Sequence, residues 1–368
     1  MEGKKIKVLM TTDTVGGVWV YSLELCRALE KYGVEIHLAA MGAWPSPAQQ
    51  VAVEKMPNVL LYKSDYRLEW MKDPWQDVEQ SRKWINSIYH TIQPDIVHLN
   101  NYAHVENDWS APVITVFHSC VQTWWQAVKG KAAPQEWDKY TNTVRESLEA
   151  SDVVVGPTRT ILEKAKNIHR FSSETKVIYN GRRSFPSEER PREKFILCMG
   201  RMWDEAKNLP LLSKIAGKLP WPVYVAGERV NPDTGKECTA ENVKFLGKLS
   251  PEEVQHWMQR ASVFVSPTRY EPFGLAILEA ANNGCALVLS ELDTLKELWQ
   301  EAALFFDPED EKDAEKMALL LLDNPLFLKE LSLRAKERAA DFSAEKMGKG
   351  YYDLYSKIAK KEHKMITA

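Results

Sequence analysis

The chain has 368 residues, of which 44% are hydrophobic and 27% are charged, and this composition excludes a disordered, fibrous or membrane-embedded protein. Its formal charge of -3 is too small to create the field with which proteins attract nucleic acid, so no nucleic-acid partner is expected. The five cysteines are scattered and never spaced as C-x-x-C, which argues against a disulfide framework or a zinc site.

The N-terminus begins M-E-G-K-K-I-K-V-L-M and turns polar after a short apolar run, so it lacks the hydrophobic region of a signal peptide. Elsewhere no stretch approaches the roughly 18 continuous apolar residues that a membrane span needs. We therefore expect a cytoplasmic protein. Peripheral contact with the inner face of a membrane stays compatible with the sequence, because net charge does not report a local basic patch.

The first half of the chain alternates short β-branched runs with stretches of helical period. It opens with K-I-K-V-L-M-T-T, a Gly16-Gly17 loop and a helical stretch, which predicts a strand, a turn and a helix. Further strands are predicted at 35–41, 58–63, 95–100, 112–118, 152–156 and 176–179, and helices at 74–93, 135–150 and 159–170. Continuous apolar runs such as D-V-V-V-G are typical of a parallel sheet covered on both faces.

A segment rich in proline and charge, S-F-P-S-E-E-R-P-R-E at 184–193, interrupts this alternation and predicts a linker. Beyond it, strands are predicted near 194–200, 222–227, 243–246, 263–266, 286–289 and 303–306. One helix start is clear, because S-P-E-E places Ser250 at the N-cap and Glu253 at N3 of a capping box. The sequence thus predicts two doubly wound α/β domains, with ligands at the carboxyl ends of the strands and in a cleft between the domains.

The segment S-P-T-R-Y-E-P-F-G-L-A-I-L-E-A follows one of these strands and contains two glutamates. With a helix predicted to begin near Phe273, Glu271 would lie in the loop and Glu279 two turns along. The backbone amides of Phe273, Gly274 and Leu275 would then be uncapped donors that can bind an anion. Alternatively, both glutamates are ordinary charges on a solvated helix, although a loop of Tyr, Pro, Phe and Gly is unusual for such a surface.

Two cations follow the first strand after the linker, in F-I-L-C-M-G-R-M-W-D-E-A-K-N. Arg201 and Lys207 would lie just past the carboxyl end of that strand. There they could neutralise a diphosphate, the arginine through a bidentate fork and the lysine as a point charge. Two ordinary surface cations are an equally good interpretation of this segment alone.

Weaker candidates lie in the first half of the chain. Gly16 and Gly17 follow the first strand, but neither a G-x-G-x-x-G dinucleotide fingerprint nor a P-loop is present. His118 ends the strand in V-I-T-V-F-H-S, a position that favours a functional role, although a lone histidine is more often structural. Asp13, near the first loop, is a weak candidate for a general base.

Together these motifs resemble the retaining nucleotide-sugar glycosyltransferases of family 4, which have the GT-B fold of two Rossmann-like domains. E-P-F-G-L-A-I-L-E resembles the family's paired-glutamate signature, and G-R-M-W-D-E-A-K-N resembles its diphosphate-binding segment. V-I-Y-N-G, P-D-I-V-H and T-V-F-H resemble further family strands, in the family's order. The resemblance covers essentially the whole chain, including a terminal helix that returns to the N-terminal domain.

The resemblance implies that Arg201 and Lys207 bind the donor diphosphate and stabilise the charge that develops as it leaves. Glu279 would hold the ribose hydroxyls. Glu271 would orient the donor sugar, together with the three amides at the start of the following helix. Because two cations and a helix N-terminus stabilise the leaving group and no D-x-D occurs, no metal or other cofactor is expected.

The resemblance also implies that Gly16 and Gly17 let the first loop approach the phosphates or the acceptor, and that His118 contacts the sugar or phosphate near the reacting carbon. Retention of the anomeric configuration would follow from front-face attack, with the leaving phosphate helping to deprotonate the acceptor. The chain departs from the family where Arg182 and Arg183 replace a common Val-Asp pair.

These observations predict a transferase that moves a sugar from a nucleotide diphosphate sugar to a saccharide or lipid-linked saccharide, in polysaccharide or glycolipid assembly. The alternatives are a sugar-nucleotide epimerase and a catalytically silent sugar-nucleotide-binding protein on the same scaffold. The predicted organisation is an acceptor-side domain at residues 1–183, a linker at 184–193, a donor-side domain at 194–345 and a terminal helix at 346–368.

Tryptophan is unevenly distributed, because nine of the 13 residues lie before residue 140. Core packing is the default interpretation for most of them. Trp19, beside the first loop, and the pair Trp124 and Trp125, shortly after His118, are candidate acceptor contacts because aromatic faces stack on sugar rings.

Overall fold

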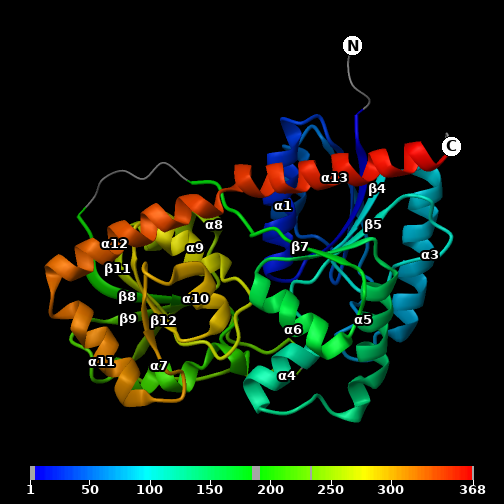
Figure 1. Cartoon of the computed structure of the whole chain (residues 1–368). Helices are drawn as coiled ribbons and strands as arrows, with labels where there is room; N and C mark the ends of the chain where they lie inside the picture. Colours follow the sequence, from blue (N-terminus) through cyan, green and yellow to red (C-terminus); the bar gives the residue numbers. More distant parts are fainter. Residues whose placement is uncertain (1–4, 185–190, 233, 367–368) are drawn as a thin grey trace. The chain divides into compact units, whose positions relative to one another are not determined.

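The computed structural model describes residues 5–184, 191–232 and 234–366 (Figure 1). The chain divides into two compact units. Unit 1 consists of residues 1–126, 131–181 and 344–368, and unit 2 consists of residues 127–130 and 182–343. Most of the predicted linker, residues 185–190, lies outside the described residues.

The described part of unit 1 contains a seven-stranded sheet in which every pair of neighbours is parallel, in the order β3-β2-β1-β4-β5-β6-β7. Its strands are β1 (Lys7–Asp13), β2 (Glu35–Met41), β3 (Val59–Lys63), β4 (Ile96–Leu99), β5 (Val113–Val116), β6 (Val153–Gly156) and β7 (Glu174–Val177). The first half of the chain also forms the helices α1 (Gly17–Glu30), α2 (Pro47–Glu54), α3 (Trp75–Ile92), α4 (Val121–Lys129), α5 (Asp138–Ala150) and α6 (Arg159–His169). Strands β4, β5 and β6 are buried at every position, as their continuous apolar sequence predicts.

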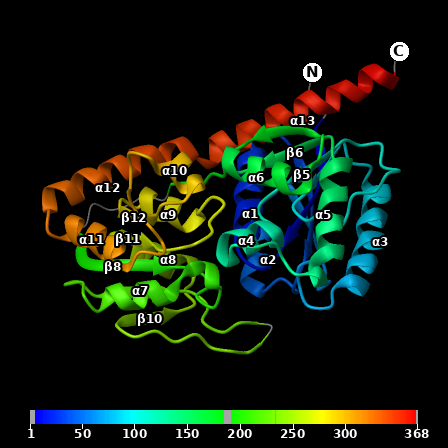
Figure 2. The same ribbon diagram turned by 60° about the horizontal axis from the view of Figure 1, so that its bottom comes forward.

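The described part of unit 2 contains a six-stranded parallel sheet in the order β10-β9-β8-β11-β12-β13. Figure 2 labels its strands β8, β10, β11 and β12. Its strands are β8 (Glu193–Met199), β9 (Val223–Ala226), β10 (Val243–Gly247), β11 (Ala261–Ser266), β12 (Ala286–Ser290) and β13 (Leu304–Phe306). Its α-helices are α7 (Leu209–Ala216), α8 (Pro251–Arg260), α9 (Leu275–Asn282), α10 (Asp293–Trp299), α11 (Glu311–Leu322) and α12 (Pro325–Ala339). The predicted fold class, two doubly wound parallel sheets, is therefore confirmed.

Each sheet reverses its strand order once. In unit 1 the reversal lies between β1 and β4, and in unit 2 it lies between β8 and β11. Loops that follow the two strands at such a point diverge and leave a crevice at the carboxyl edge of the sheet, where doubly wound proteins bind ligands. The segments after β1, β4, β8 and β11 are therefore the expected ligand-binding segments of the two sheets.

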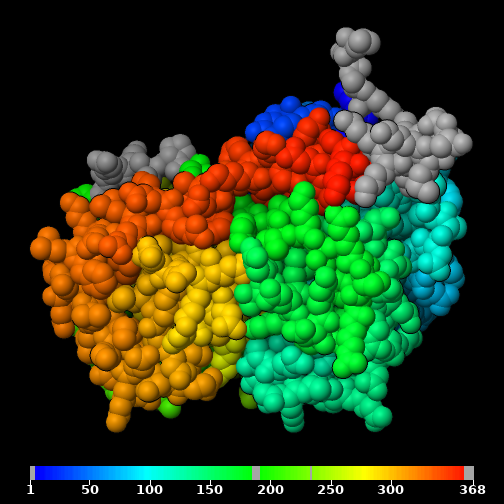
Figure 3. All heavy atoms as spheres, in the orientation of Figure 1, coloured from blue at the N-terminus to red at the C-terminus, as the bar shows by residue number. Residues whose placement is uncertain are grey.

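The C-terminal helix α13 (Ala344–Ile366) packs on α1 within unit 1, which confirms the predicted return of the chain (Figures 1 and 3). Tyr351, Leu354, Tyr355 and Ile358 are buried, at the spacing of one helix face. Gly348 permits the close approach, because a Cβ at this position would lie 2.6 Å from the Cβ of Ala28. In sphere representation, the red surface of α13 borders a blue surface that belongs to the N-terminal part of unit 1 (Figure 3).

The capping box predicted at the start of α8 is present. The Ser250 hydroxyl accepts a hydrogen bond from the Glu253 amide at 3.2 Å, and the Glu253 carboxylate accepts one from the Ser250 amide at 2.7 Å. We expect Ser250→Ala to lower the free energy of unfolding by about 1 kcal/mol, because an amide of the first turn loses its acceptor. Urea unfolding measures this change, and an unaltered midpoint would show that the cap adds nothing to stability.

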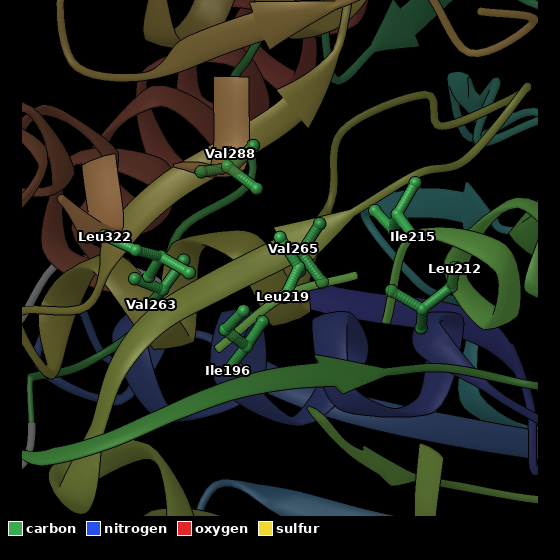
Figure 4. A pocket seen from close by; sticks show the side chains of 9 residues that line it. Ile196, Leu212, Ile215, Leu219, Val263, Val265, Val288 and Leu322 are labelled. Atoms are coloured by element: carbon green, nitrogen blue, oxygen red, sulfur yellow. The ribbon is translucent and has the colours of Figure 1, made fainter. Parts of the chain in front are cut away.

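A small apolar cavity of about 10 Å³ lies in the core of unit 2 (Figure 4). The side chains around it are Ile196, Leu212, Ile215, Leu219, Val263, Val265, Val288, Ala318 and Leu322. Since a buried water needs two to four polar partners, this lining excludes water and leaves a packing void. The cavity is therefore part of the hydrophobic core and is unrelated to the polar loops at the carboxyl edge.

Candidate functional site

In unit 2, the residues that the sequence singles out follow two neighbouring strands at the reversal point. Strand β8 leads into the segment with Arg201 and Lys207, and β11 leads into the loop with Glu271 and Gly274. The two strands pair in parallel, so both segments leave the sheet at the same edge. The two segments are far apart in the sequence, but the pairing of β8 with β11 brings them together at this edge.

Lys207 and Glu271 form an ion pair, with 2.8 Å between Nζ and Oε2. Both side chains are mostly buried, at 20% and 18% exposure, so solvent screens the pair less than a surface salt bridge. Lys207 ends a short 3₁₀ turn, Glu205–Lys207, whose start is capped by the Asp204 carboxylate accepting from the Ala206 amide at 2.9 Å. Lys207 and Glu271 are therefore partners of each other and are mostly shielded from solvent.

Hydrogen bonds to the Ala206 carbonyl fix the loop of Glu271 against the turn of Lys207. The Thr268 hydroxyl donates to that carbonyl at 2.7 Å, and the Arg269 amide donates to it at 2.8 Å. On the other side, the Thr294 hydroxyl donates to the Glu271 carbonyl at 2.6 Å. The ion pair is thus held by backbone contacts that do not depend on the two charged side chains.

The amino end of α9 opens beside this pair. The helix begins at Leu275 rather than near Phe273, where the sequence predicts its start, because Gly274 adopts a left-handed conformation with φ of 86° and serves as N-cap. A Cβ at Gly274 would also lie 2.7 Å from Ile277 Cδ1. No side chain among the described residues caps this end, so its first amides point outward as donors for an anion.

Glu279 lies on α9 and forms an ion pair with Arg182, with 2.5 Å between the guanidinium and Oε1. Both side chains are mostly buried, at 15% exposure for Arg182 and 20% for Glu279. The Arg182 amide also donates to the Phe342 carbonyl at 3.1 Å, which fixes the backbone of the arginine. Sequence reasoning missed this pair, although the unusual N-G-R-R segment was a signal that Arg182 has a specific partner.

Arg201 has different surroundings. Its side chain is 41% exposed, lies 3.8 Å from the Asp204 carboxylate and stacks over the Trp203 ring at 5.4 Å. The predicted pair of cations thus consists of a mostly buried lysine that is bound to Glu271 and a more exposed arginine on the same loop. The exposed guanidinium keeps its fork of donors accessible to solvent.

In unit 1, α1 begins at Gly17 with Gly16 as N-cap, and both glycines are exposed. The preceding loop is shaped by Asp13, whose carboxylate accepts a hydrogen bond from the Val15 amide at 3.0 Å. Asp13 is buried and contributes to the structure of this loop.

His118 follows β5 and is oriented by Asn100, which directly follows the neighbouring strand β4. Its Nε2 lies 2.8 Å from Asn100 Oδ1. The Asn100 amide nitrogen donates to the Thr11 carbonyl at 2.7 Å, so the amide oxygen must face the imidazole and accept from it. His118 therefore carries its proton on Nε2. Burial lowers the pKa of His118, so the ring is neutral and Nδ1 keeps its lone pair.

The three candidate tryptophans differ in exposure. Trp19 is only 7% exposed and belongs to the core of unit 1. Trp124 and Trp125 on α4 are half-buried, with ring centroids 6.0 Å apart and planes at 73°. The Lys131 ammonium lies 5.9 Å from the centre of the Trp125 ring.

The described residues contain no group of three or more His, Cys, Asp or Glu side chains that could hold a metal ion. None of the helices in the same part of the chain is both long and apolar enough to cross a membrane.

Among the buried histidines of unit 1, His98 and His104 are at most 2% exposed, and burial lowers the pKa of both to about 3. Between pH 6.5 and 3 the unfolded chain therefore binds protons at these rings, whereas the folded chain does not. The contribution of these two histidines to the free energy of unfolding is fully present above about pH 6.5. It falls with the pH below this value, by up to about 1.4 kcal/mol per histidine for each pH unit.

Urea unfolding at about pH 7 and about pH 5 measures this loss. His104, which bonds to the Ser81 hydroxyl at 2.9 Å, lies outside the candidate site, so His104→Gln is the variant to compare. We expect the variant to show a weaker pH dependence than the parent chain. Equal slopes for the two proteins would contradict the assignment of buried, neutral imidazoles.

Two models of known protein families match the chain. The family model described as "Glycosyltransferase Family 4" matches residues 15–182, and the one described as "Glycosyl transferases group 1" matches residues 193–324. The chain belongs to glycosyltransferase family 4. The two matches include every candidate site residue from Gly16 to Glu279.

Curated relatives of this family-4 chain are named as transferases of single sugars. The lipopolysaccharide core biosynthesis mannosyltransferase LpsB of Rhizobium meliloti is 24% identical over 46% of this chain and 53% of its own length. The D-rhamnosyltransferase WbpZ of Pseudomonas aeruginosa is 23% identical over 77% of this chain and 76% of its own. The chain thus spans about half the length of LpsB.

Solved structures share the fold along nearly the whole chain. Sucrose-phosphate synthase of Thermosynechococcus elongatus has a TM-score of 0.77 at 16% identity and covers 96% of this chain and 99% of its own. Anabaena HepE in complex with UDP-glucose has a TM-score of 0.73 at 14% identity and covers 96% and 100%. At these identities the likeness establishes the GT-B fold of the family-4 chain and leaves its substrates to be argued from the site.

Proposed function

We propose that the chain transfers a sugar from a nucleotide diphosphate sugar to a saccharide or lipid-linked saccharide acceptor, with retention of the anomeric configuration. The observation that carries the proposal is the ion pair of Lys207 and Glu271 beside the open amino end of α9 in a family-4 chain. A cation, a carboxylate and outward amides at one edge of a sheet match the needs of a sugar diphosphate.

The donor diphosphate would bind to the Lys207 ammonium and the Arg201 guanidinium. Lys207 supplies a fixed point charge, and the exposed fork of Arg201 can grip two phosphate oxygens. As the bond from the sugar to the diphosphate breaks, negative charge grows on the leaving oxygen. Groups that are already in place stabilise this charge without reorganisation, which makes them the main source of rate acceleration here.

The sugar and ribose of the donor would be held by the two glutamates. Glu271, with the amides of Phe273, Gly274 and Leu275, would accept and donate hydrogen bonds to the sugar hydroxyls. Glu279 would accept from the ribose hydroxyls while Arg182 keeps its carboxylate oriented. The similar structure of Anabaena HepE holds UDP-glucose, which supports a nucleotide sugar as the donor class.

In unit 1, Gly16 and Gly17 would allow a close approach of donor or acceptor to the exposed first loop. His118 has its Nε2 proton committed to Asn100, so its Nδ1 lone pair would accept a hydrogen bond from a sugar hydroxyl near the reacting carbon. Retention would follow from front-face attack, in which a leaving phosphate oxygen takes the acceptor proton. This pathway requires no separate side chain as general base.

The acceptor would be a saccharide or a lipid-linked saccharide in polysaccharide or glycolipid assembly, as the name of LpsB supports. Trp124 and Trp125 are its proposed contacts, because their half-buried rings offer faces on which sugars stack. Trp19 offers much less surface at 7% exposure. A lipid-linked acceptor would bring the protein to the inner face of a membrane as a peripheral contact.

Incubation with a panel of nucleotide sugars distinguishes this function from its alternatives. A transferase releases nucleoside diphosphate, slowly by hydrolysis alone and faster with an acceptor. An epimerase interconverts two sugar nucleotides without release, and a silent binding protein leaves every donor unchanged. Release of diphosphate is the expected result, and either of the other two outcomes would overturn the proposal.

A further inference from the structure

A chain of buried polar rings connects the C-terminal helix to the neighbourhood of His118, entirely within unit 1. Its members are Tyr355 on α13, His98 on β4 and Tyr21 on α1, each no more than 1% exposed. Polar groups at such depth carry a desolvation cost and persist where hydrogen bonds offset it. The transfer mechanism above assigns none of these three residues a role.

Contacts run without a break along this chain. The Tyr355 hydroxyl lies 2.6 Å from His98 Nδ1, and His98 Nε2 lies 3.4 Å from the Tyr21 hydroxyl. The Tyr21 ring then meets the His118 ring edge-on, with centroids 4.7 Å apart and planes at 73°. His118 is thus held by Tyr21 through ring packing and by Asn100 through its Nε2 proton.

The direction of the hydrogen bonds follows from the chemistry of a neutral imidazole. Burial, with a contribution from nearby His118, lowers the pKa of His98 to about 3, so one ring nitrogen donates and the other accepts. The 2.6 Å contact is typical of a hydroxyl donor rather than an N–H donor. Tyr355 therefore donates to Nδ1, and the Nε2 proton of His98 points to the Tyr21 oxygen.

We propose that Tyr355 of the C-terminal helix is a positioning residue for His118, acting through His98 and Tyr21. The hydroxyl fixes the tautomer of His98, His98 fixes the Tyr21 hydroxyl, and the Tyr21 ring fixes the plane of the His118 imidazole. The inference rests on the proposed function in taking His118 as a group that contacts the donor sugar. In this proposal, the packing of α13 on unit 1 also serves to orient His118.

The test is Tyr355→Phe, which removes one oxygen and keeps the ring. We expect kcat for transfer to fall by about 3- to 10-fold, the value of one hydrogen bond, while KM for the donor stays within about twofold. The donor KM should change little because the residues proposed to hold the diphosphate and the ribose belong to unit 2. Tyr352→Phe is the matched control, since Tyr352 lies on the same helix and stacks on the Tyr32 ring at 4.3 Å.

Nitrogen-15 NMR of histidine-labelled protein gives a second readout that does not require activity. We expect His98 and His118 both to show a protonated Nε2, and Tyr355→Phe to shift the ring signals of both, whereas Tyr352→Phe shifts neither. If the His118 signals stay in place in Tyr355→Phe, or if the two variants lose activity equally, the proposal is overturned. Absence of turnover in the parent protein would count against the proposed function, and the NMR result would still decide the positioning role.

Discussion

Replacing Lys207 by alanine is expected to lower kcat for transfer by about 10²- to 10³-fold, the usual cost of removing one preorganised group that stabilises a developing anion. The Nζ of Lys207 is already fixed 2.8 Å from Glu271, so its charge is in place before the donor diphosphate begins to leave. Steady-state kinetics with the donor that the panel identifies measures the change. The fold should persist, since Thr268 and Arg269 hold the loop through backbone contacts.

Lys218→Ala is the matched control for this variant. Lys218 also belongs to unit 2 and is also paired with carboxylates, those of Glu311 and Glu315, but at the exposed surface. We expect its kinetics to equal those of the parent protein. Near-normal turnover in Lys207→Ala, or an equal loss in both variants, would remove Lys207 from the reacting centre.

Glu279→Ala is expected to raise KM for the donor by about 10- to 100-fold with a much smaller effect on kcat. The reason is that hydrogen bonds from hydroxyls to a charged acceptor contribute about 1.5–3 kcal/mol, and ribose contacts act equally in the ground state and the transition state. Arg182→Ala should move KM in the same direction, because its guanidinium orients the Glu279 carboxylate. Kinetics and calorimetric binding of the nucleoside diphosphate measure both effects.

Glu330→Ala serves as the control, because Glu330 is also a helical glutamate of unit 2 paired with an arginine, Arg334, but lies on the exposed face of α12. Its donor KM should stay at the parent value. A Glu279→Ala protein that loses kcat while binding nucleoside diphosphate normally would contradict the assignment to the ribose.

The fold was largely predictable because its signals are local. Short apolar runs separated by helical stretches predict buried parallel strands, and the capping box at Ser250 fixes one helix start to the residue. The start of α9 was placed two residues early, because the left-handed backbone of Gly274 depends on contacts with its surroundings. Local patterns do not encode such contacts.

The sequence predicted which residues belong to the candidate site better than it predicted which of them contact each other. Lys207 and Glu271 were named from separate motifs, but their ion pair depends on β8 and β11 being neighbours in the sheet, which spacing alone does not show. The same reason explains why the partners of His118 and Glu279 were missed. Asn100 and Arg182 reach them only in the folded chain.

We propose a retaining transfer in which Lys207 stabilises the negative charge on the leaving diphosphate. Proton NMR of a reaction with donor and saccharide acceptor tests it most directly, because one spectrum series reports the sugar consumed, the linkage formed and its anomeric configuration. We expect a product with the configuration of the donor and release of nucleoside diphosphate, and we expect both to be nearly absent with Lys207→Ala. A product of inverted configuration, or an epimerised donor without release, would contradict it.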